Sequence, residues 1–346
     1  MIEIIKDRAE WSSLLGKVEC YDFYHTYEYH LISKKQDEEP ILLKYSESNI
    51  LIAIPLLLRS IPNSNYKDCT SVYGYSGPIS NNVDDNFDAT AFASKFQTFL
   101  IENNIVTIFS RLNPFIPNQI FCIKGLGSIS SLSEVVNIDI TKDEEDQKKG
   151  YNKRLRTHVN KARRECYVRE AATKEDIRQY IALYYDNMKR VNAKQEYFFG
   201  EEYFFELLNA TDFNARILLA LKKETNKIIA GAMFIESNKI VQYHLSGSDA
   251  NFMHLYPIKL LIDEMRLTAS RDNLIYFNLG GGVKNSKDSL FDFKASFSKD
   301  FKPFKVWRYI INNKVYEELV AKKQEKECAI FHKECSLFFP CYRCNI

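Results

Sequence analysis

The sequence concentrates glycine at one point where chemistry could follow. The chain has only 12 glycines in 346 residues, yet three of them stand together at Gly280–Gly282. They come directly after a strand-like run, residues 273–278, and the pair Phe293 and Lys294 follows closely. A backbone that leaves a strand through glycines can adopt positive φ, or let a ligand approach it closely. We therefore expect a functional site at this loop.

The bulk composition is that of an ordinary folded protein. A chain of 346 residues exceeds the usual size of one hydrophobic core, so we expect two domains. Hydrophobic residues make up 45% of the chain and charged residues 27%, as in soluble globular proteins. The formal net charge of +2 excludes an overall attraction to nucleic acid or acidic lipid. Any such binding must come from a local patch.

No stretch of the sequence predicts a membrane span or a secretion signal. None reaches the roughly 18 consecutive apolar residues of a membrane helix. Residues 1–11 carry acids where a signal peptide needs a basic region and an apolar core. We therefore expect a cytoplasmic protein that could still contact a membrane surface peripherally.

Half of the cysteines crowd the C-terminal tail. Eight cysteines in a chain of this length do not predict a disulfide framework. Cys328, Cys335, Cys341 and Cys344 lie near His332, and the last two cysteines have the CxxC spacing of a zinc site. Because no second CxxC accompanies them, the sequence favours an aromatic tail that packs on the domains. The metal content of the tail stays open.

The two halves of the chain repeat one pattern of elements. Each half predicts two strands, then an amphipathic helix, then another strand. The predicted segments are 50–58, 71–79, 88–102 and 105–110 in the first half, and 228–235, 240–247, 257–270 and 274–278 in the second. This spacing predicts duplication of one unit. The alternation of strands and helices predicts an α/β or α+β class with mixed sheets.

A switch of charge separates the halves. Acidic residues at 143–146 are followed by basic residues from Lys148 to Arg164, an order that a helix dipole favours. We place the boundary near residue 145, which gives domains at 1–145 and 146–310 and a tail at 311–346. The basic run could follow the phosphates of RNA or an anionic membrane surface. It could equally be a solvated linking helix whose charges balance the acids before it.

A set of short motifs occurs in a recognisable order from about residue 20 to 300. The matching segments are 23–27, 73–78, 111–114, 151–162, 184–190 with 197–198, 243–247, and 280–282 with 293–294. In this the chain resembles the FemAB/FemX family of aminoacyltransferases and related polysaccharide-associated acyltransferases. The resemblance implies two tandem GNAT-like (acyl-CoA N-acyltransferase-like) domains.

The resemblance also implies a reaction. The family joins an activated acyl group to an amine. In its peptidoglycan branch, an aminoacyl-tRNA acylates the side-chain amine of a cell-wall precursor that carries a nucleotide or lipid diphosphate. The expected partners are therefore a nucleotide- or lipid-linked glycan or muropeptide precursor and an aminoacyl-tRNA. The chemistry requires no metal.

Transfer of an acyl group to an amine passes through an anionic tetrahedral intermediate. Donors aimed at that oxygen are usually the largest catalytic contribution. Backbone N–H groups of residues 280–283 could supply such donors, and Lys294 could supply a positive charge. In the family, the lysine of this Phe-Lys pair lies at the transfer centre. Phe293 is expected to pack or to line the acyl pocket.

A general base could take the proton of the attacking amine. His244 and Asp292 are the local candidates. His244 follows Tyr243 on a predicted strand, so one of the two should face the cleft and the other the core.

The acceptor site of the family lies mostly in the first domain. Here its candidates are Tyr73, Tyr75 and Ser76, and Arg190 comes from the second half. Arginine suits a diphosphate because its planar fork binds two oxygens. Tyr243 is a further candidate for binding substrate.

The donor stays open between an aminoacyl-tRNA and an acyl-CoA, with no other cofactor expected. GNAT enzymes hold the acetyl-CoA pyrophosphate with the backbone amides of a glycine-containing loop before a helix. The corresponding segments, 78–85 and 248–256, hold no glycine, and Asp249 would repel phosphate. This departure favours the tRNA donor.

Three other functions remain as alternatives. The first is an acetyl-CoA-dependent N-acetyltransferase of polysaccharide synthesis. The second is a non-catalytic GNAT-like protein that binds a glycan precursor, against which the retained Gly280–Gly282 and Lys294 argue. The third, an RNA-binding adaptor, depends only on the basic run.

Overall fold

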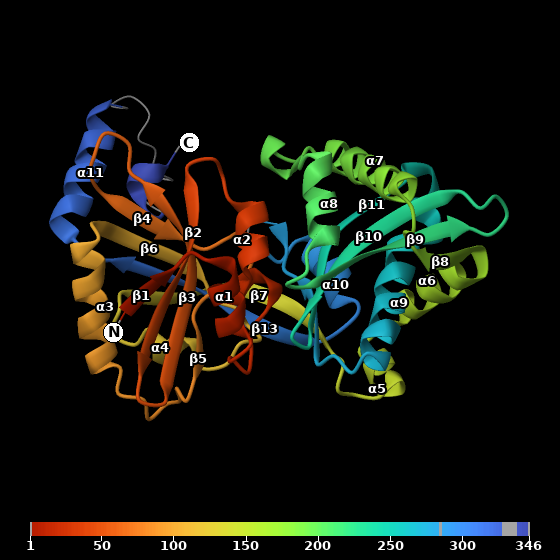
Figure 1. The fold of residues 1–346 in the computed structure, drawn as a ribbon. Helices are drawn as coiled ribbons and strands as arrows, with labels where there is room; N and C mark the ends of the chain where they lie inside the picture. The colour runs from red at the N-terminus through yellow and green to blue at the C-terminus, as the bar shows by residue number, and fades with distance from the viewer. Residues whose placement is uncertain (1, 284–285, 327–337, 345–346) are drawn as a thin grey trace. The chain divides into compact units, whose positions relative to one another are not determined.

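The chain folds into two compact units (Figure 1). The computed structural model describes residues 2–283, 286–326 and 338–344. Unit 1 comprises residues 1–132 and 304–346, and unit 2 comprises residues 133–303. These boundaries differ from the expected ones near 145 and 310, and the tail belongs to unit 1. The reason is that the chain passes between the units inside two strands, β7 (Ser128–Asp139) and β13 (Asp300–Ile310), which no change of composition marks.

Unit 1 is a mixed sheet with helices. Its strand order is β1-β2-β3-β4-β6-β13, and β5 pairs with β3. Neighbouring strands in this order run antiparallel, whereas β4 and β6 run parallel. The strands are β1 Ile2–Ile5, β2 Glu38–Glu47, β3 Ile50–Ser60, β4 Lys67–Thr70, β5 Ile79–Asn81 and β6 Ile105–Arg111. The helices are α1 Arg8–Leu15, α2 Tyr27–Ser33, α3 Thr90–Glu102, α4 Gln119–Cys122 and α11 Asn313–Lys326.

Unit 2 repeats this construction. Its strand order is β7-β12-β11-β10-β9-β8; β11 and β12 run parallel, and the other neighbouring strands in this order are antiparallel. The strands are β8 Cys166–Glu170, β9 Asn214–Lys222, β10 Ile228–Ser237, β11 Ile240–Ser248 and β12 Tyr276–Gly280. The helices are α5 Glu144–Lys149, α6 Lys153–Glu165, α7 Lys174–Arg190, α8 Glu201–Asn209, α9 Pro257–Arg271 and α10 Ser289–Ala295.

A parallel pair joined by one helix recurs in both units. In unit 1 it is β4-α3-β6, and in unit 2 it is β11-α9-β12. This confirms the mixed α/β class. One predicted strand of the repeat is wrong, because residues 71–78 form an irregular connection between β4 and β5. Gly74 and Gly77 turn the backbone there with φ of 123° and 84°, values that a strand does not adopt.

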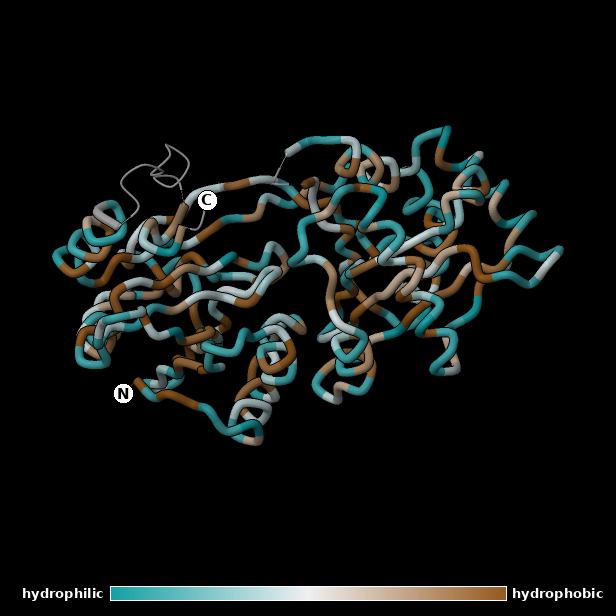
Figure 2. Tube along the Cα trace, turned by 90° about the horizontal axis from the view of Figure 1, so that it is seen from above, coloured by the Kyte–Doolittle hydropathy of each residue, from teal (hydrophilic) through white to brown (hydrophobic). Residues whose placement is uncertain are grey.

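Each unit has its own hydrophobic core (Figure 2). The core of unit 2 lies between the sheet and the helices α6 and α9, and it includes Val159, Leu260 and Phe277. The core of unit 1 includes Phe92 of α3 and Trp307 of β13. The buried side chains of α9 anchor the helix to the core of unit 2, and the helix packs against β9, β10 and β11.

The described part of the tail docks on unit 1. Tyr342 donates its hydroxyl to Asp68 at 3.0 Å, and Arg343 Nε donates to the same carboxylate at 2.8 Å. Cys328, His332 and Cys335 lie outside the described residues. Among the residues that the structure describes, no group of His, Cys, Asp and Glu side chains is arranged to hold a metal ion. Within the same ranges, no helix is long and apolar enough to span a membrane.

Candidate functional site

The glycine run and Lys294 meet in unit 2. Lys294 lies near the end of α10, is 9% exposed, and donates from Nζ to the carbonyl oxygen of Gly281 at 2.7 Å. The helix that carries it begins with Asp288 as N-cap, whose carboxylate accepts from Phe291 N at 2.9 Å and from Val283 N at 3.0 Å. The cap therefore joins the glycine loop to the helix and fixes the lysine against the loop.

Each of the three glycines is required for a different reason. Gly280 has a φ of 78°, and a Cβ atom there would lie 3.1 Å from Lys294 Nζ. A Cβ atom on Gly281 would lie 2.9 Å from the carbonyl oxygen of Glu134 in β7. A Cβ atom on Gly282 would collide with the carbonyl oxygen of Ser286. The run thus lets the backbone turn beside the lysine while it packs against β7.

Two buried amides hold the start of the loop. Asn278 of β12 accepts from Gly280 N at 2.8 Å through Oδ1, and its Nδ2 donates to Gln242 Oε1 of β11 at 2.7 Å. Both side chains are almost fully buried. The parallel register of β11 with β12 ends at the pair of Gln242 and Asn278. The two amide side chains therefore fix the start of the glycine loop at the point where the pairing of β11 with β12 ends.

Burial changes the acidity of Lys294. Desolvation lowers its pKa from the ordinary 10.5 to about 8, and the charge of Asp288 only partly opposes this shift. The ammonium form predominates at pH 7, so Lys294 can place a positive charge beside the glycine backbone. Such a charge, held away from water, stabilises a developing oxyanion more than it would in solvent.

His244 lies at an irregularity of the sheet. Met233 of β10 pairs with Leu245 and Phe234 pairs with Tyr243, so His244 is the extra residue of a β-bulge. Its Nε2 lies 2.9 Å from the Tyr203 hydroxyl of α8. Burial lowers the pKa of His244 to about 4, so the imidazole is neutral at physiological pH. A neutral imidazole is the form that a general base requires.

The other candidates of unit 2 are Tyr243, Phe293 and Arg190. The Tyr243 hydroxyl hydrogen-bonds to Ser246 Oγ, and burial raises its pKa to about 12. Phe293 packs at the edge of the unit 2 core. Arg190 ends α7, is exposed, and contacts Asn187 Oδ1 and Met253 Sδ. A substrate role for Tyr243 and Arg190 stays a prediction.

Residues 73–76 form an aromatic loop in unit 1. Tyr73 is 60% exposed, and its carbonyl oxygen accepts from the Tyr29 hydroxyl at 3.0 Å. Tyr75 is half-buried and packs edge-on against Phe304, with 5.2 Å between ring centroids. Ser76 is fully buried, and its carbonyl oxygen accepts from Gln119 Nε2 at 2.9 Å. Of the three candidates, Tyr73 is the one whose ring is presented to solvent.

Arg111 stands beside that exposed ring. Its Cζ lies 5.5 Å from the centroid of Tyr73, at the end of β6. No ion pair links Arg111 to a carboxylate within the described ranges. An arginine without an acid partner next to an exposed ring can bind a planar, negatively charged ligand. Arg111 opens the segment 111–114 that the resemblance covers, but no local sequence signal singles out its side chain.

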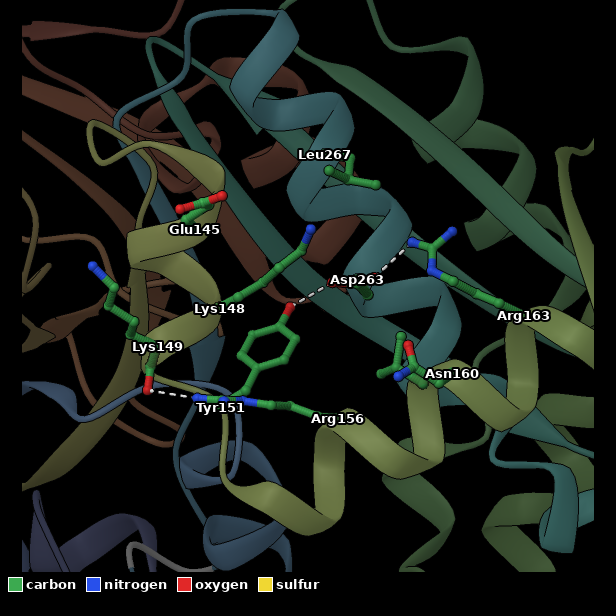
Figure 3. A pocket seen from close by; sticks show the side chains of 10 residues that line it. Glu145, Lys148, Lys149, Tyr151, Arg156, Asn160, Arg163, Asp263 and Leu267 are labelled. Atoms are coloured by element: carbon green, nitrogen blue, oxygen red, sulfur yellow. Dashed lines mark hydrogen bonds and ion pairs between the residues drawn. The ribbon is translucent and has the colours of Figure 1, made fainter.

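The basic run lines a pocket of about 520 Å³ between α5, α6 and α9 (Figure 3). Most of its charges are compensated: Arg163 pairs with Asp263 at 2.6 Å, and Lys148 pairs with Glu144 at 3.5 Å. Asp263 also accepts from the Tyr151 hydroxyl at 2.7 Å. Neither Lys294 nor the glycine run lines this pocket. The pocket is therefore separate from the candidate transfer site.

The segment before α9 differs from a glycine-containing phosphate loop. It forms a 3-10 helix, Ala250–Leu255, and Tyr256 then takes a left-handed conformation. Asp249 accepts from Asn251 N at 3.0 Å and from Lys227 Nζ at 2.8 Å. Lys227 offsets the charge of Asp249, so the feature of this segment that disfavours acyl-CoA is its lack of glycine.

Comparison with known proteins identifies the relatives of this site. Residues 219–303 match the FemAB family, a segment that contains His244, the glycine run and Lys294. The chain is an acyltransferase whose segment 219–303 is FemAB-like. Among curated protein sequences no match was found.

Solved structures show the fold of this FemAB-like chain. The crystal structure of FemX has a TM-score of 0.70 at 13% identity, over 91% of this chain and 99% of that chain. A conserved protein of unknown function from Bacteroides thetaiotaomicron VPI-5482 has a TM-score of 0.56 at 13% identity, over 90% of this chain and 100% of that chain. The C-terminal domain of a candidate lysylphosphatidylglycerol synthetase from Agrobacterium fabrum has a TM-score of 0.53 at 14% identity, over 91% and 95%.

Proposed function

We propose that this FemAB-like chain transfers an aminoacyl group to a primary amine of a nucleotide- or lipid-linked glycan or muropeptide precursor. The observation that supports it most is the contact of the buried Lys294 ammonium with the Gly281 carbonyl, inside the segment that matches FemAB. A fixed cation beside a glycine backbone suits the oxyanion of acyl transfer to an amine.

The reaction is a direct displacement. The acceptor amine attacks the ester carbonyl of the donor, and the carbonyl oxygen takes up negative charge near Lys294. Collapse of the intermediate breaks the ester bond, forms the amide, and releases the donor hydroxyl. The proton lost by the amine reaches that hydroxyl directly, through water, or through His244, whose neutral imidazole can accept it.

The acceptor contributes an anion that unit 1 could recognise. The Arg111 guanidinium and the Tyr73 ring together suit a diphosphate attached to a flat base or sugar. We assign recognition of the acceptor to these two residues, and the transfer step to unit 2.

The donor is proposed to be an aminoacyl-tRNA. The support is that segment 248–256 is a 3-10 helix without glycine, where acyl-CoA enzymes use a loop of free amides. Calorimetric titration with acetyl-CoA at modest salt tests this directly. Micromolar binding would favour the alternative, an acetyl-CoA-dependent N-acetyltransferase of polysaccharide synthesis.

The decisive assay offers charged tRNA and an amine-bearing precursor to the purified protein. We expect amide formation with the wild-type chain and almost none with Lys294→Met. If no donor reacts while the precursor still binds, the chain is a precursor-binding protein and the proposed activity is wrong.

A further inference from the structure

Unit 2 carries a group of cations without acidic partners on the edge where α6 meets the start of α9. Its members are Arg154 and Lys161 of α6 and Lys259 of α9, arranged around His158 and Tyr256. We call these five residues the cationic cluster. The pocket of Figure 3 is lined by other residues of α6, among them Arg156, Asn160 and Arg163.

The cluster has a defined geometry. Lys259 Nζ lies 2.9 Å from His158 Nδ1, and burial together with the neighbouring cations lowers the pKa of His158. The His158 ring stacks on Tyr256 with centroids 3.5 Å apart and planes 11° from parallel. Lys161 Nζ and Lys259 Nζ lie 5.6 Å and 5.5 Å from the Tyr256 centroid. The two ammonium groups are thus placed by contacts rather than extended into solvent.

No carboxylate in the described part of the chain pairs with these cations. Among the described residues, no ion pair involves Arg154, Lys161 or Lys259, and Lys161 donates only to the His254 carbonyl at 3.1 Å. Asp263 lies one helical turn after Lys259, but it is bound by Arg163, Arg266 and Tyr151. Burial and then the charge of Arg154 lower the pKa of Lys259. The repulsion between neighbouring cations is unfavourable, and a bound anion would relieve it.

The cluster borders the candidate transfer site. Lys259 Nζ lies 5.8 Å from the ring centroid of Phe293, the residue directly before Lys294. Lys259 is also in the first turn of α9, where the helix dipole adds positive charge. An anion bound here would lie within a few side chains of the reacting acyl group.

We infer that the cationic cluster binds a backbone phosphate at the acylated end of the RNA donor. This rests on the proposed function, because it takes the donor to be an aminoacyl-tRNA. Ammonium and guanidinium groups are the usual partners of nucleic-acid phosphates. In the pocket of Figure 3, by contrast, Lys148, Lys149 and Arg163 are already paired with acidic side chains. The basic run of α5 and α6 therefore divides into a part that binds phosphate and a part that is structural.

The inference can be tested without any reaction by measuring the binding of an RNA that has the sequence of a tRNA acceptor end and carries no aminoacyl group. We expect Lys161→Met and Lys259→Met each to weaken binding roughly 10-fold and to lower the slope of log affinity against log salt by about one. Lys161→Arg and Lys259→Arg keep the charge and should retain most of the affinity. Lys148→Met, which removes a lysine paired with Glu144, is the matched control and should change nothing.

The outcomes separate the two proposals. Equal RNA affinity for wild type, Lys161→Met and Lys259→Met would overturn the phosphate site. Loss of binding to acetyl-CoA in these variants, with RNA unaffected, would also overturn it, because the phosphate would then belong to another donor. Normal RNA binding that responds to the variants, with no transfer from charged tRNA, would leave the site standing and contradict the proposed function.

Discussion

The ammonium of Lys294 donates to the carbonyl oxygen of Gly281 from a position that is almost fully buried. Burial lowers its pKa from 10.5 to about 8. This shift corresponds to about 3 kcal/mol by which the charged lysine destabilises the folded state. A buried charge with one carbonyl partner is costly for stability. A residue that lowers stability in this way is expected at a functional site, which agrees with the transfer role proposed for Lys294.

Lys294→Met should therefore separate activity from stability. We expect the transfer rate to fall by about 100-fold or more, as when one oxyanion donor is removed. The free energy of unfolding should not decrease at pH 7, because methionine carries no desolvation cost. Urea unfolding together with the transfer assay checks both. Lys299→Met, at an exposed lysine close by, serves as the control, and an equal loss of rate there would contradict the assignment.

The pH dependence of transfer should follow the same lysine. As pH rises through about 8, Lys294 loses its proton and its charge, so the rate should fall above that pH. A rate that instead rises through pH 8 would show that the neutral amine acts, as a base.

Stability should change in the opposite direction. The folded pKa is below the unfolded one, so the unfolded chain binds more protons between pH 8 and 10.5. Unfolding free energy relative to Lys294→Met should therefore rise with pH across that window. Below pH 8 the difference between the two proteins should stay constant.

Gly280→Ala should damage the site more than the fold. The residue has a φ of 78°, and the new methyl group would lie 3.1 Å from Lys294 Nζ. Gly125→Ala is a matched control, because Gly125 has a φ of 81° and no atom near its Cβ position. Both variants should lose about 1–2 kcal/mol of stability through the left-handed backbone. Only Gly280→Ala should also lower the transfer rate, and equal rates for the two would count against close packing at Lys294.

Substitutions at Arg111 and Tyr73 should affect acceptor binding. Arg111→Met removes the guanidinium that lies 5.5 Å from the Tyr73 centroid. We expect KM for the acceptor to rise about 10-fold, with little change in kcat. Tyr73→Phe keeps the ring and should resemble wild type, whereas Tyr73→Ala should resemble Arg111→Met. A fall in kcat at constant KM would place these residues in the chemical step instead.

Asp68 should matter for the tail and not for transfer. Its fully buried carboxylate pairs with Arg59 at 2.7 Å and with Arg343 at 2.8 Å. Asp68→Asn leaves two partly buried guanidinium groups without their counter-charge, so we expect a loss of about 3 kcal/mol in unfolding free energy. Thermal or urea unfolding measures this. Unchanged stability would mean that the tail docks without this carboxylate.

Features that depend on neighbouring residues could be predicted from the sequence. The glycine run and Lys294 lie close in sequence, so the strand, loop and short helix that bring them together follow from local signals. The same holds for the repeated strand-helix-strand pattern, because hydrophobic periodicity is a local property. The strand predicted over residues 71–78 was wrong, because the aromatic residues of this segment favour a strand while its glycines turn the backbone.

Local sequence patterns thus suffice to predict the mixed α/β class, the repeat, and the proximity of Gly280–Gly282 to Lys294. Which charges are compensated is visible only in the folded chain: Lys148 and Arg163 pair with acids, whereas Lys161 and Lys259 pair with none among the described residues. The tertiary structure also sets the bulge at His244 and the unit boundaries inside β7 and β13. These depend on strand register and on pairs of residues far apart in the chain, which no local pattern encodes.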